Sequence, residues 1–270
     1  MERSLPDPHP IAWNHRQSVI EVFRHALYRT GLYRALYFAR RQAGLITDHL
    51  AAADRRARFE AIYNLGVWKY NGGQEALSGA GSELAATAPL RSALAGLLTE
   101  LDIERFVDVG CGDWTWMSKV DLPCRYLGVD IVGSVIALNH TRYARDGVAF
   151  QKLDAVSEEL PSCDAALCRE VIFHLSFADG QRLLDNMIRS ADWVILTTDR
   201  SIWFNSDIRT GDFRRLNLER APFRLPPPDR VLADDGREPG RICGVWNTAK
   251  LRKRRHVVAL DREAAEVRGN

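Results

Sequence analysis

The sequence lacks several features by which large classes of protein are recognised. It has only five cysteines in 270 residues, and no two of them are separated by just two residues, which argues against a disulfide framework and a zinc site. No apolar run approaches the roughly 20 residues needed to span a bilayer. The first residues are polar and rich in proline, unlike a secretory leader. We therefore expect reduced thiols, no metal site and a cytoplasmic location.

A strong excess of one charge is also missing. Lysine and arginine number 37 and aspartate and glutamate 35, which gives a formal net charge of +2. Since nucleic-acid-binding proteins usually carry a clear positive excess, this balance gives no reason to expect a nucleic acid partner.

Two basic stretches interrupt this balance. Between residues 16 and 41, six arginines alternate with aromatic side chains, and the apolar residues repeat at helical spacing. Such helices either pack on the core with a solvated basic face, which we favour, or make a peripheral contact with the anionic inner face of a membrane. Residues 250–255 carry five more basic side chains, which we interpret as a solvated tail, with RNA or lipid contact as the alternative.

The order of apolar segments predicts an α/β protein with a helical N-terminal extension and a doubly wound, mostly parallel sheet of the Rossmann type. Residues 16–60 have helical periodicity. A glycine-rich stretch follows, with Ser82 as a candidate N-cap for a helix that includes Leu84. Another helix is expected over 90–101. Short apolar strands then alternate with helices, and an antiparallel hairpin is expected at the sheet edge. The predicted strands are 106–109, 126–130, 148–152, 165–168, 193–197, 230–233 and 242–246, with helices over 116–120, 132–143 and 179–190.

The chemistry is concentrated in a glycine turn. The segment Val107-Asp108-Val109-Gly110-Cys111-Gly112 predicts a buried strand followed by a turn, and Asp130 ends the next predicted strand. Glycines let the backbone come close to a ligand, and an acid at the end of the second strand can accept bonds from both ribose hydroxyls. A dinucleotide site would have a third glycine where this chain has Thr115. S-adenosylmethionine has no phosphate and carries two cationic centres, so acids at successive strand ends suit it better.

From about residue 106 to 246 the chain resembles the class I S-adenosylmethionine-dependent methyltransferases. The glycine segment is similar to their first motif, Asp130 to the acid that holds the ribose, Asp154-Ala155 to the adenine side, and residues 168–176 to the motif bordering the transferable methyl group. Where many members have a further glycine, this chain has Trp114, which either stacks near the cofactor or fills space beneath the turn. A finer resemblance, to a branch whose substrates are mostly unassigned, rests on segments such as 78–82 and 211–213. The resemblance implies a cofactor site formed by Asp108, Gly110, Gly112, Trp114, Asp130, Ile131, Asp154, Ala155 and Arg169.

The resemblance also implies domains and a reaction. We expect a helical extension with a lid over the cofactor (1–88), a methyltransferase domain that binds S-adenosylmethionine (89–250) and a basic tail (251–270). The expected reaction is O-methylation of a small-molecule or saccharide hydroxyl, with His174 either the general base or a packing residue. The polar loop over 200–223 is expected to face the acceptor, and Trp68 with residues 78–82 to form the lid. The alternatives are methyl transfer to RNA or protein, and a non-catalytic cofactor-binding protein.

Overall fold

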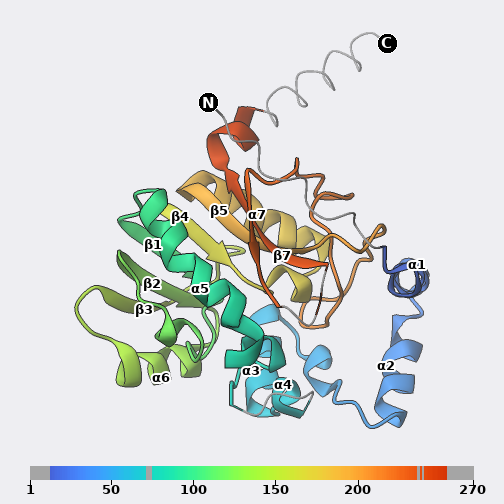
Figure 1. The fold of residues 1–270 in the computed structure, drawn as a ribbon. Coiled ribbons are helices and arrows are strands. Elements are labelled where there is room, and N and C mark those ends of the chain that lie inside the picture. The colour runs from blue at the N-terminus through green and yellow to red at the C-terminus, as the bar shows by residue number, and fades with distance from the viewer. Residues whose placement is uncertain (1–12, 71–74, 236–237, 239, 254–270) are drawn as a thin grey trace.

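The computed structural model describes residues 13–70, 75–235, 238 and 240–253. A seven-stranded sheet with the order β3-β2-β1-β4-β5-β7-β6 forms its centre, with helices on both faces (Figure 1). Residues 254–270, most of the predicted basic tail, lie outside the described residues. The three predicted domain ranges stay a prediction.

The sheet confirms the predicted fold class. Five strands run parallel: β1 (Arg105–Val109), β2 (Arg125–Asp130), β3 (Val148–Lys152), β4 (Cys163–Cys168) and β5 (Ala191–Asp199). The last strand, β7 (Arg241–Asn247), is antiparallel to β5 and to β6 (Arg230–Ala233). The strands β6 and β7 therefore form the antiparallel hairpin expected at the sheet edge.

The central strands are continuously apolar because helices cover both faces of the sheet. In β4, Ala166 belongs to the core beneath α7 (Phe177–Ser190), and the next residue, Leu167, to the core beneath α5 (Leu84–Glu100). The helix α6 (Gly133–Tyr143) packs on the α5 side, beside β2 and β3 (Figure 1). Successive residues of a strand thus serve two cores, and the carboxyl ends of the parallel strands meet along one edge.

The N-terminal extension is helical but interrupted. It contains α1 (His15–Arg29), α2 (Tyr33–Gln42), α3 (Arg55–Asn64) and the short α4 (Val67–Tyr70), with the 3₁₀ turn η1 (Asp48–Ala51) before α3. The first two lie to one side of the sheet, whereas α3 and α4 lie at the carboxyl ends of the parallel strands (Figure 1). Residues 16–60 therefore form several short helices, which the periodicity alone did not separate.

Two local predictions were wrong. Over 116–120 the chain forms only a 3₁₀ turn, η3 (Met117–Lys119), instead of a helix. The N-cap of α5 is Glu83, not Ser82, and its side chain makes no capping bond to the helix. Instead the Glu83 carboxylate accepts hydrogen bonds from the backbone of the preceding loop, so it fastens the loop to the start of the helix.

The helix α5 is continuous through Pro89, whereas we expected a helix that includes Leu84 and a separate one over 90–101. Proline has no backbone donor, so the Ala85 carbonyl, four residues earlier, loses its intrahelical partner. Two side chains bond to carbonyls of the first turn. Thr87 Oγ1 donates to the Glu83 carbonyl at 3.0 Å, and the Arg91 guanidinium donates to the Leu84 carbonyl at 3.0 Å.

Candidate functional site

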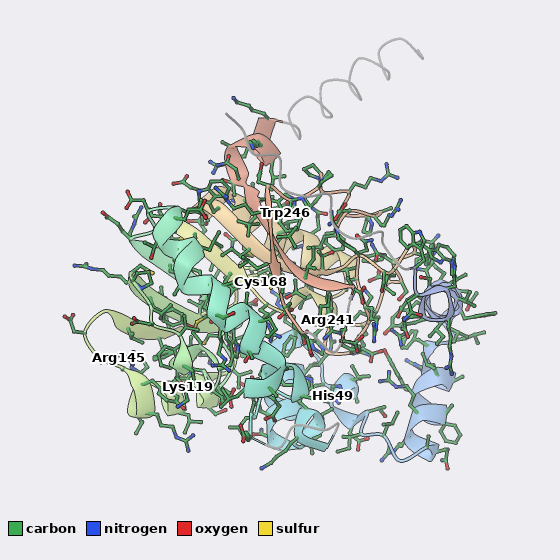
Figure 2. All side chains as sticks on the ribbon, viewed as in Figure 1. His49, Lys119, Arg145, Cys168, Arg241 and Trp246 are labelled. Carbon is green, nitrogen blue, oxygen red and sulfur yellow. The ribbon has the colours of Figure 1, made fainter. Side chains whose placement is uncertain are left out.

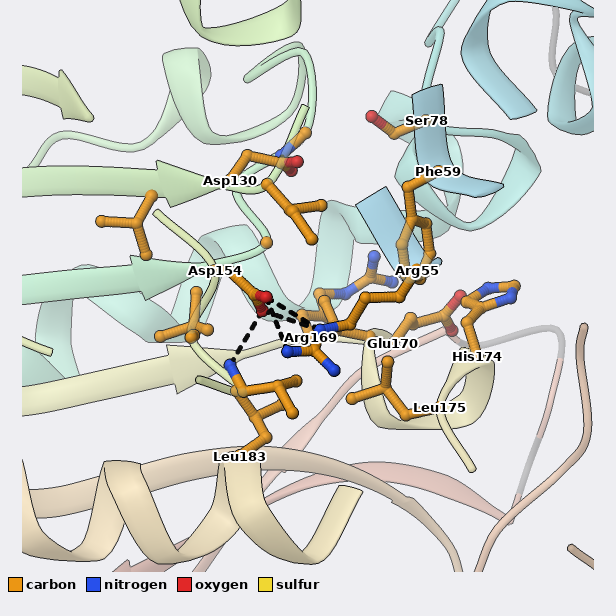
Figure 3. A pocket seen from close by; sticks show the side chains of 18 of the residues that line it. Arg55, Phe59, Ser78, Asp130, Asp154, Arg169, Glu170, His174, Leu175 and Leu183 are labelled. Atoms are coloured by element: carbon orange, nitrogen blue, oxygen red, sulfur yellow. Dashed lines mark hydrogen bonds and ion pairs between the residues drawn. The ribbon is translucent and has the colours of Figure 1, made fainter. Parts of the chain in front are cut away.

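A cavity lies where the carboxyl ends of the parallel strands meet the N-terminal helices (Figure 3). Its volume, including the open mouth, is about 840 Å³, which is within the usual range for small-molecule sites. One wall comes from the turns after β1, β2, β3 and β4, and the facing wall from α3, α4 and the loop before α5. Eight of the predicted site residues line it: Gly110, Gly112, Asp130, Ile131, Asp154, Ala155, Arg169 and His174.

The glycine turn is fixed by neighbouring side chains. Gly110 and Gly112 have φ angles of 73° and 56°, in the left-handed region that disfavours side chains. A Cβ on Gly110 would lie 2.3 Å from Val171 Cγ2, and a Cβ on Gly112 would lie 2.2 Å from Ser78 Oγ. Both glycines are therefore required by the packing of the protein itself, in addition to any ligand.

Asp113 joins this turn to the segment over residues 78–82. Its carboxylate accepts from the Leu77 backbone at 2.7 Å and from Ser78 Oγ at 3.0 Å, and the Asp113 backbone donates to Ser78 Oγ at 3.0 Å. Ser78, Ser82 and Trp68 all line the cavity on the side where the lid was predicted.

Asp130 presents a carboxylate of fixed orientation to the cavity. One oxygen accepts from the Gly112 backbone at 3.1 Å and the other from the Val132 backbone at 2.9 Å. Burial raises the pKa of this carboxyl to about 6, although the backbone bonds oppose the shift. Such a carboxylate still has lone pairs for the two hydroxyls of a ribose.

Asp154, on the next strand end, is already engaged. The Arg55 Nε lies 3.0 and 2.8 Å from its two oxygens, and Ser157 Oγ donates at 2.8 Å. Burial alone raises the pKa of Asp154, but the bonds from Arg55 and Ser157 outweigh it and lower the pKa. The contact between Arg55 and Asp154 is visible in Figure 3. Arg55 also contacts Asp179 at 3.3 Å, so it joins α3 to the end of β3 and to the start of α7.

Two residues predicted at the cofactor site, Asp108 and Trp114, do not line the cavity. Asp108 accepts from the Tyr126 hydroxyl at 2.7 Å, and burial raises the pKa of Asp108 to about 7. Trp114 is 1% exposed, and its ring lies 5.4, 4.9 and 5.4 Å from those of Tyr126, Tyr143 and Phe150. The indole therefore fills space beneath the turn.

Arg169 and Glu170 follow β4 at the cavity, and each pairs with a distant residue instead of with its neighbour. Arg169 donates to Asp234 at 2.8 Å and to the Gly81 carbonyl at 2.8 Å, while Glu170 accepts from Arg241 at 2.7 Å. The Nη2 of Arg169 is buried and has no hydrogen-bond partner within the described residues. A charged donor is therefore left over in a side chain that lines the cavity.

His174 has a defined tautomer. Its Nδ1 lies 2.9 Å from the Asp212 carbonyl, and because a carbonyl can only accept, Nδ1 carries the proton. The lone pair of the neutral ring is then on Nε2, which no hydrogen bond engages within the described part of the chain. Burial lowers the pKa of His174, so the ring is neutral at pH 7. Trp68 and Phe213 flank it, with ring centroids 5.2 and 5.4 Å away.

None of the residues of the polar loop over 200–223 lines this cavity, although five of them line a second pocket: Arg200, Asn217, Glu219, Arg220 and Ala221. Its backbone and side chains hold the segment after β4 instead. Asp212 fixes His174, and Thr210 Oγ1 accepts from the Ser176 backbone at 2.9 Å. The loop therefore positions the histidine.

Three cavity residues of α3 were not predicted: Arg55, Phe59 and Tyr63. They are four residues apart and so share one face of the helix. Tyr63 lies with its hydroxyl 3.0 Å from Ser78 Oγ, and burial raises its pKa well above the ordinary value. The regular spacing of polar and aromatic residues, next to a glycine-rich loop, was the signal in the sequence.

Residues 107–191 match a family model described as a methyltransferase domain. No curated protein matches the chain. It is similar to solved structures of an S-adenosylmethionine-dependent methyltransferase from Clostridium acetobutylicum ATCC 824 (10% identity, 41% of this chain and 49% of that one, TM-score 0.37) and of a magnesium protoporphyrin IX methyltransferase from Synechocystis PCC 6803 with bound S-adenosylhomocysteine (14%, 56% and 74%, 0.44). A third is an N-methyltransferase from Bradyrhizobium japonicum WM9 with S-adenosylhomocysteine (13%, 59% and 87%, 0.41). The chain thus spans about half the length of the first of these.

Proposed function

We propose that this chain is a class I S-adenosylmethionine-dependent methyltransferase and that it transfers the methyl group to a hydroxyl of a small molecule or a saccharide. The methyltransferase-domain match over residues 107–191 and the sheet order support the use of S-adenosylmethionine. The acceptor class is the finer part of the proposal. The observation that carries it is the unengaged Nε2 of His174 in the cavity wall.

The cavity residues fit the cofactor. Asp130 would hold the ribose hydroxyls, and the turn at Gly110 and Gly112 would take the methionine part, where a Cβ would already crowd the protein. The spare Nη2 of Arg169 suits a carboxylate. When bound, S-adenosylmethionine supplies an electrophilic methyl group and a neutral sulfide leaving group.

The acceptor hydroxyl must lose its proton as the new bond forms. His174 can accept it on Nε2, because the ring is neutral and Nδ1–H is held by the Asp212 carbonyl. That carbonyl also stabilises the imidazolium that results. Trp68 and Tyr63 wall the cavity with aromatic surface, which excludes water from the reacting groups.

The test compares His174→Gln with the natural chain. Both are incubated with S-adenosylmethionine carrying a tritiated methyl group and a native extract, and labelled products are sorted by chemical class. We expect label in small molecules or saccharides, and turnover about 10²–10⁴-fold lower in His174→Gln, with unchanged affinity for S-adenosylhomocysteine. His15→Gln, at the exposed start of α1, is the matched control and should keep full turnover.

Other outcomes would contradict the proposal. Label in RNA or protein would show that the acceptor is a macromolecule. Binding of S-adenosylhomocysteine without any labelled product would show that the chain binds the cofactor but is not an enzyme. Full activity of His174→Gln would leave the histidine only a packing role.

We also propose that the enzyme works beside a membrane, on its inner face. Among the described residues, no helix is both long and apolar enough to cross a bilayer, so the contact would be peripheral. Support comes from the six arginines and the aromatic residues of the N-terminal helices.

A further inference from the structure

The helix α1 is docked on the protein by its polar face. Its buried residues are Ser18 and Glu21, both 0% exposed. The Glu21 carboxylate accepts hydrogen bonds from Gln17, Arg24 and Ser206, and Ser18 Oγ accepts from the Trp203 backbone at 3.3 Å. A helix on the surface of a globular protein normally buries its apolar residues instead.

The apolar residues of α1 point outward. Phe23 is 68% exposed, and Val19 and Ile20, which lie four and three residues before it on the same face of the helix, are exposed too. The pattern continues through α2 and its ends, where Leu32, Phe38 and Leu45 are exposed, and Phe38 is 65% exposed. The two helices lie at the edge of the molecule, with side chains around them (Figure 2). We call the exposed apolar residues of the two helices the outer face: Val19, Ile20, Phe23, Leu32 and Phe38.

The charge of this region has one sign. Arg16, Arg29 and Arg34 are exposed on the same two helices. Glu21 is the sole acid between residues 15 and 45, and it is buried. The outer face therefore combines exposed apolar side chains with arginines and no exposed acid.

We propose that the outer face docks on an anionic lipid bilayer. Apolar side chains enter the boundary between headgroups and acyl chains, and the arginines contact lipid phosphates, as in other interfacial helices. A second copy of the chain fits less well, because a twofold contact would set these arginines against their counterparts. This docking surface is separate from the cavity and does not depend on the identity of the methyl acceptor.

The same helices hold the segment that orients His174. Arg24 donates to the Phe213 carbonyl at 2.9 Å, and Arg40 pairs with Asp212 at 2.7 Å. Asp212 and Phe213 are the residues that fix and flank His174. The helices that carry the outer face thus contact the segment that in turn contacts His174 in the cavity wall. Docking of the outer face would therefore place methyl transfer at the membrane surface.

The experiment is sedimentation of the full chain with sucrose-loaded vesicles. Phosphatidylcholine vesicles are compared with vesicles that also contain phosphatidylglycerol. The natural chain should bind the anionic vesicles and be released by salt. The double variant Ile20→Ser/Phe23→Ser should bind at least roughly tenfold more weakly, because two apolar side chains no longer enter the lipid. Val231→Ser, which changes an exposed apolar residue on the edge strand β6, should bind like the natural chain.

A charge test accompanies it. Arg29→Glu/Arg34→Glu should lose binding to anionic vesicles, whereas Arg142→Glu, on α6 across the sheet from α1, should not (Figure 1). All variants should bind S-adenosylhomocysteine normally, so a folding defect is visible separately. Failure of the natural chain to sediment, or equal binding by the Ile20/Phe23 variant, would overturn the proposal. So would a dimer in light scattering that the same variant dissociates, since a second copy would then cover the face.

Discussion

Replacing Gly110 with alanine tests whether the glycine turn is held by the protein itself. The residue has a φ of 73°, and a side chain in that conformation costs about 1–2 kcal/mol. The new Cβ would also lie 2.3 Å from Val171 Cγ2, and such overpacking costs about 1–3 kcal/mol. The free energy of unfolding should therefore fall by roughly 2–5 kcal/mol.

Thermal unfolding followed by circular dichroism measures this effect. Each kcal/mol lowers Tm by about 2–4 °C in a domain of this size, so we expect a loss of roughly 4–20 °C. Adding Val171→Ala to Gly110→Ala should restore part of the loss, although Val171→Ala alone should lower Tm. Gly96→Ala is the matched control. Its Cβ meets nothing within 4 Å inside α5, and the change should stabilise the helix by about 0.5–1 kcal/mol.

The test is decided by whether Val171→Ala raises or lowers the Tm of the Gly110→Ala variant. If Val171→Ala lowers Tm as much in the Gly110→Ala background as in the natural chain, the two residues do not collide. If Gly110→Ala is as stable as the natural chain, the strained turn is also refuted.

Two further predictions concern the cavity. Burial raises the pKa of Asp130 to about 6, above its ordinary 3.8. Ionising this carboxyl costs free energy in the unliganded folded state, so the carboxyl is protonated below about pH 6. Only the ionised carboxylate accepts hydrogen bonds from both ribose hydroxyls. Affinity for S-adenosylhomocysteine should thus fall by up to about tenfold per unit as the pH drops below 6, and calorimetry should show no such dependence in Asp130→Asn. Arg55→Ala should lower the free energy of unfolding in urea by about 1–3 kcal/mol, because Asp154 and Asp179 lose a partly buried partner. Its exposed neighbour Arg56→Ala should change it by less than about 0.5 kcal/mol, and equal effects of the two would contradict the ion pair.

The sheet could be predicted because its strands are short apolar runs covered on both faces. The predicted ranges 148–152 and 230–233 coincide with β3 and β6. Gly110 and Asp130, both predicted as site residues from the sequence, line the cavity. Both follow from local sequence, since a positive φ favours glycine and a strand end fixes where an acid lies.

What the sequence could not give depends on long-range packing. Trp114 takes a φ of 57°, and nothing in the local sequence indicates that its indole turns toward Tyr126 and Phe150. Arg55 and Asp154 are 99 residues apart and meet only in the folded chain. The polar loop over 200–223 was expected on the acceptor side because ligands lie beyond the carboxyl ends of the strands. Its Asp212 carbonyl instead accepts from His174, a contact that the sequence does not indicate.

The central claim is that the strand ends at Gly110 and Asp130 form a site for S-adenosylmethionine. A crystal structure of the full chain with S-adenosylhomocysteine tests it most directly. We predict the ribose hydroxyls on the Asp130 carboxylate and the amino acid part beside the glycine turn. A complex with the ligand bound elsewhere, or with this cavity empty at saturating ligand, would contradict the account.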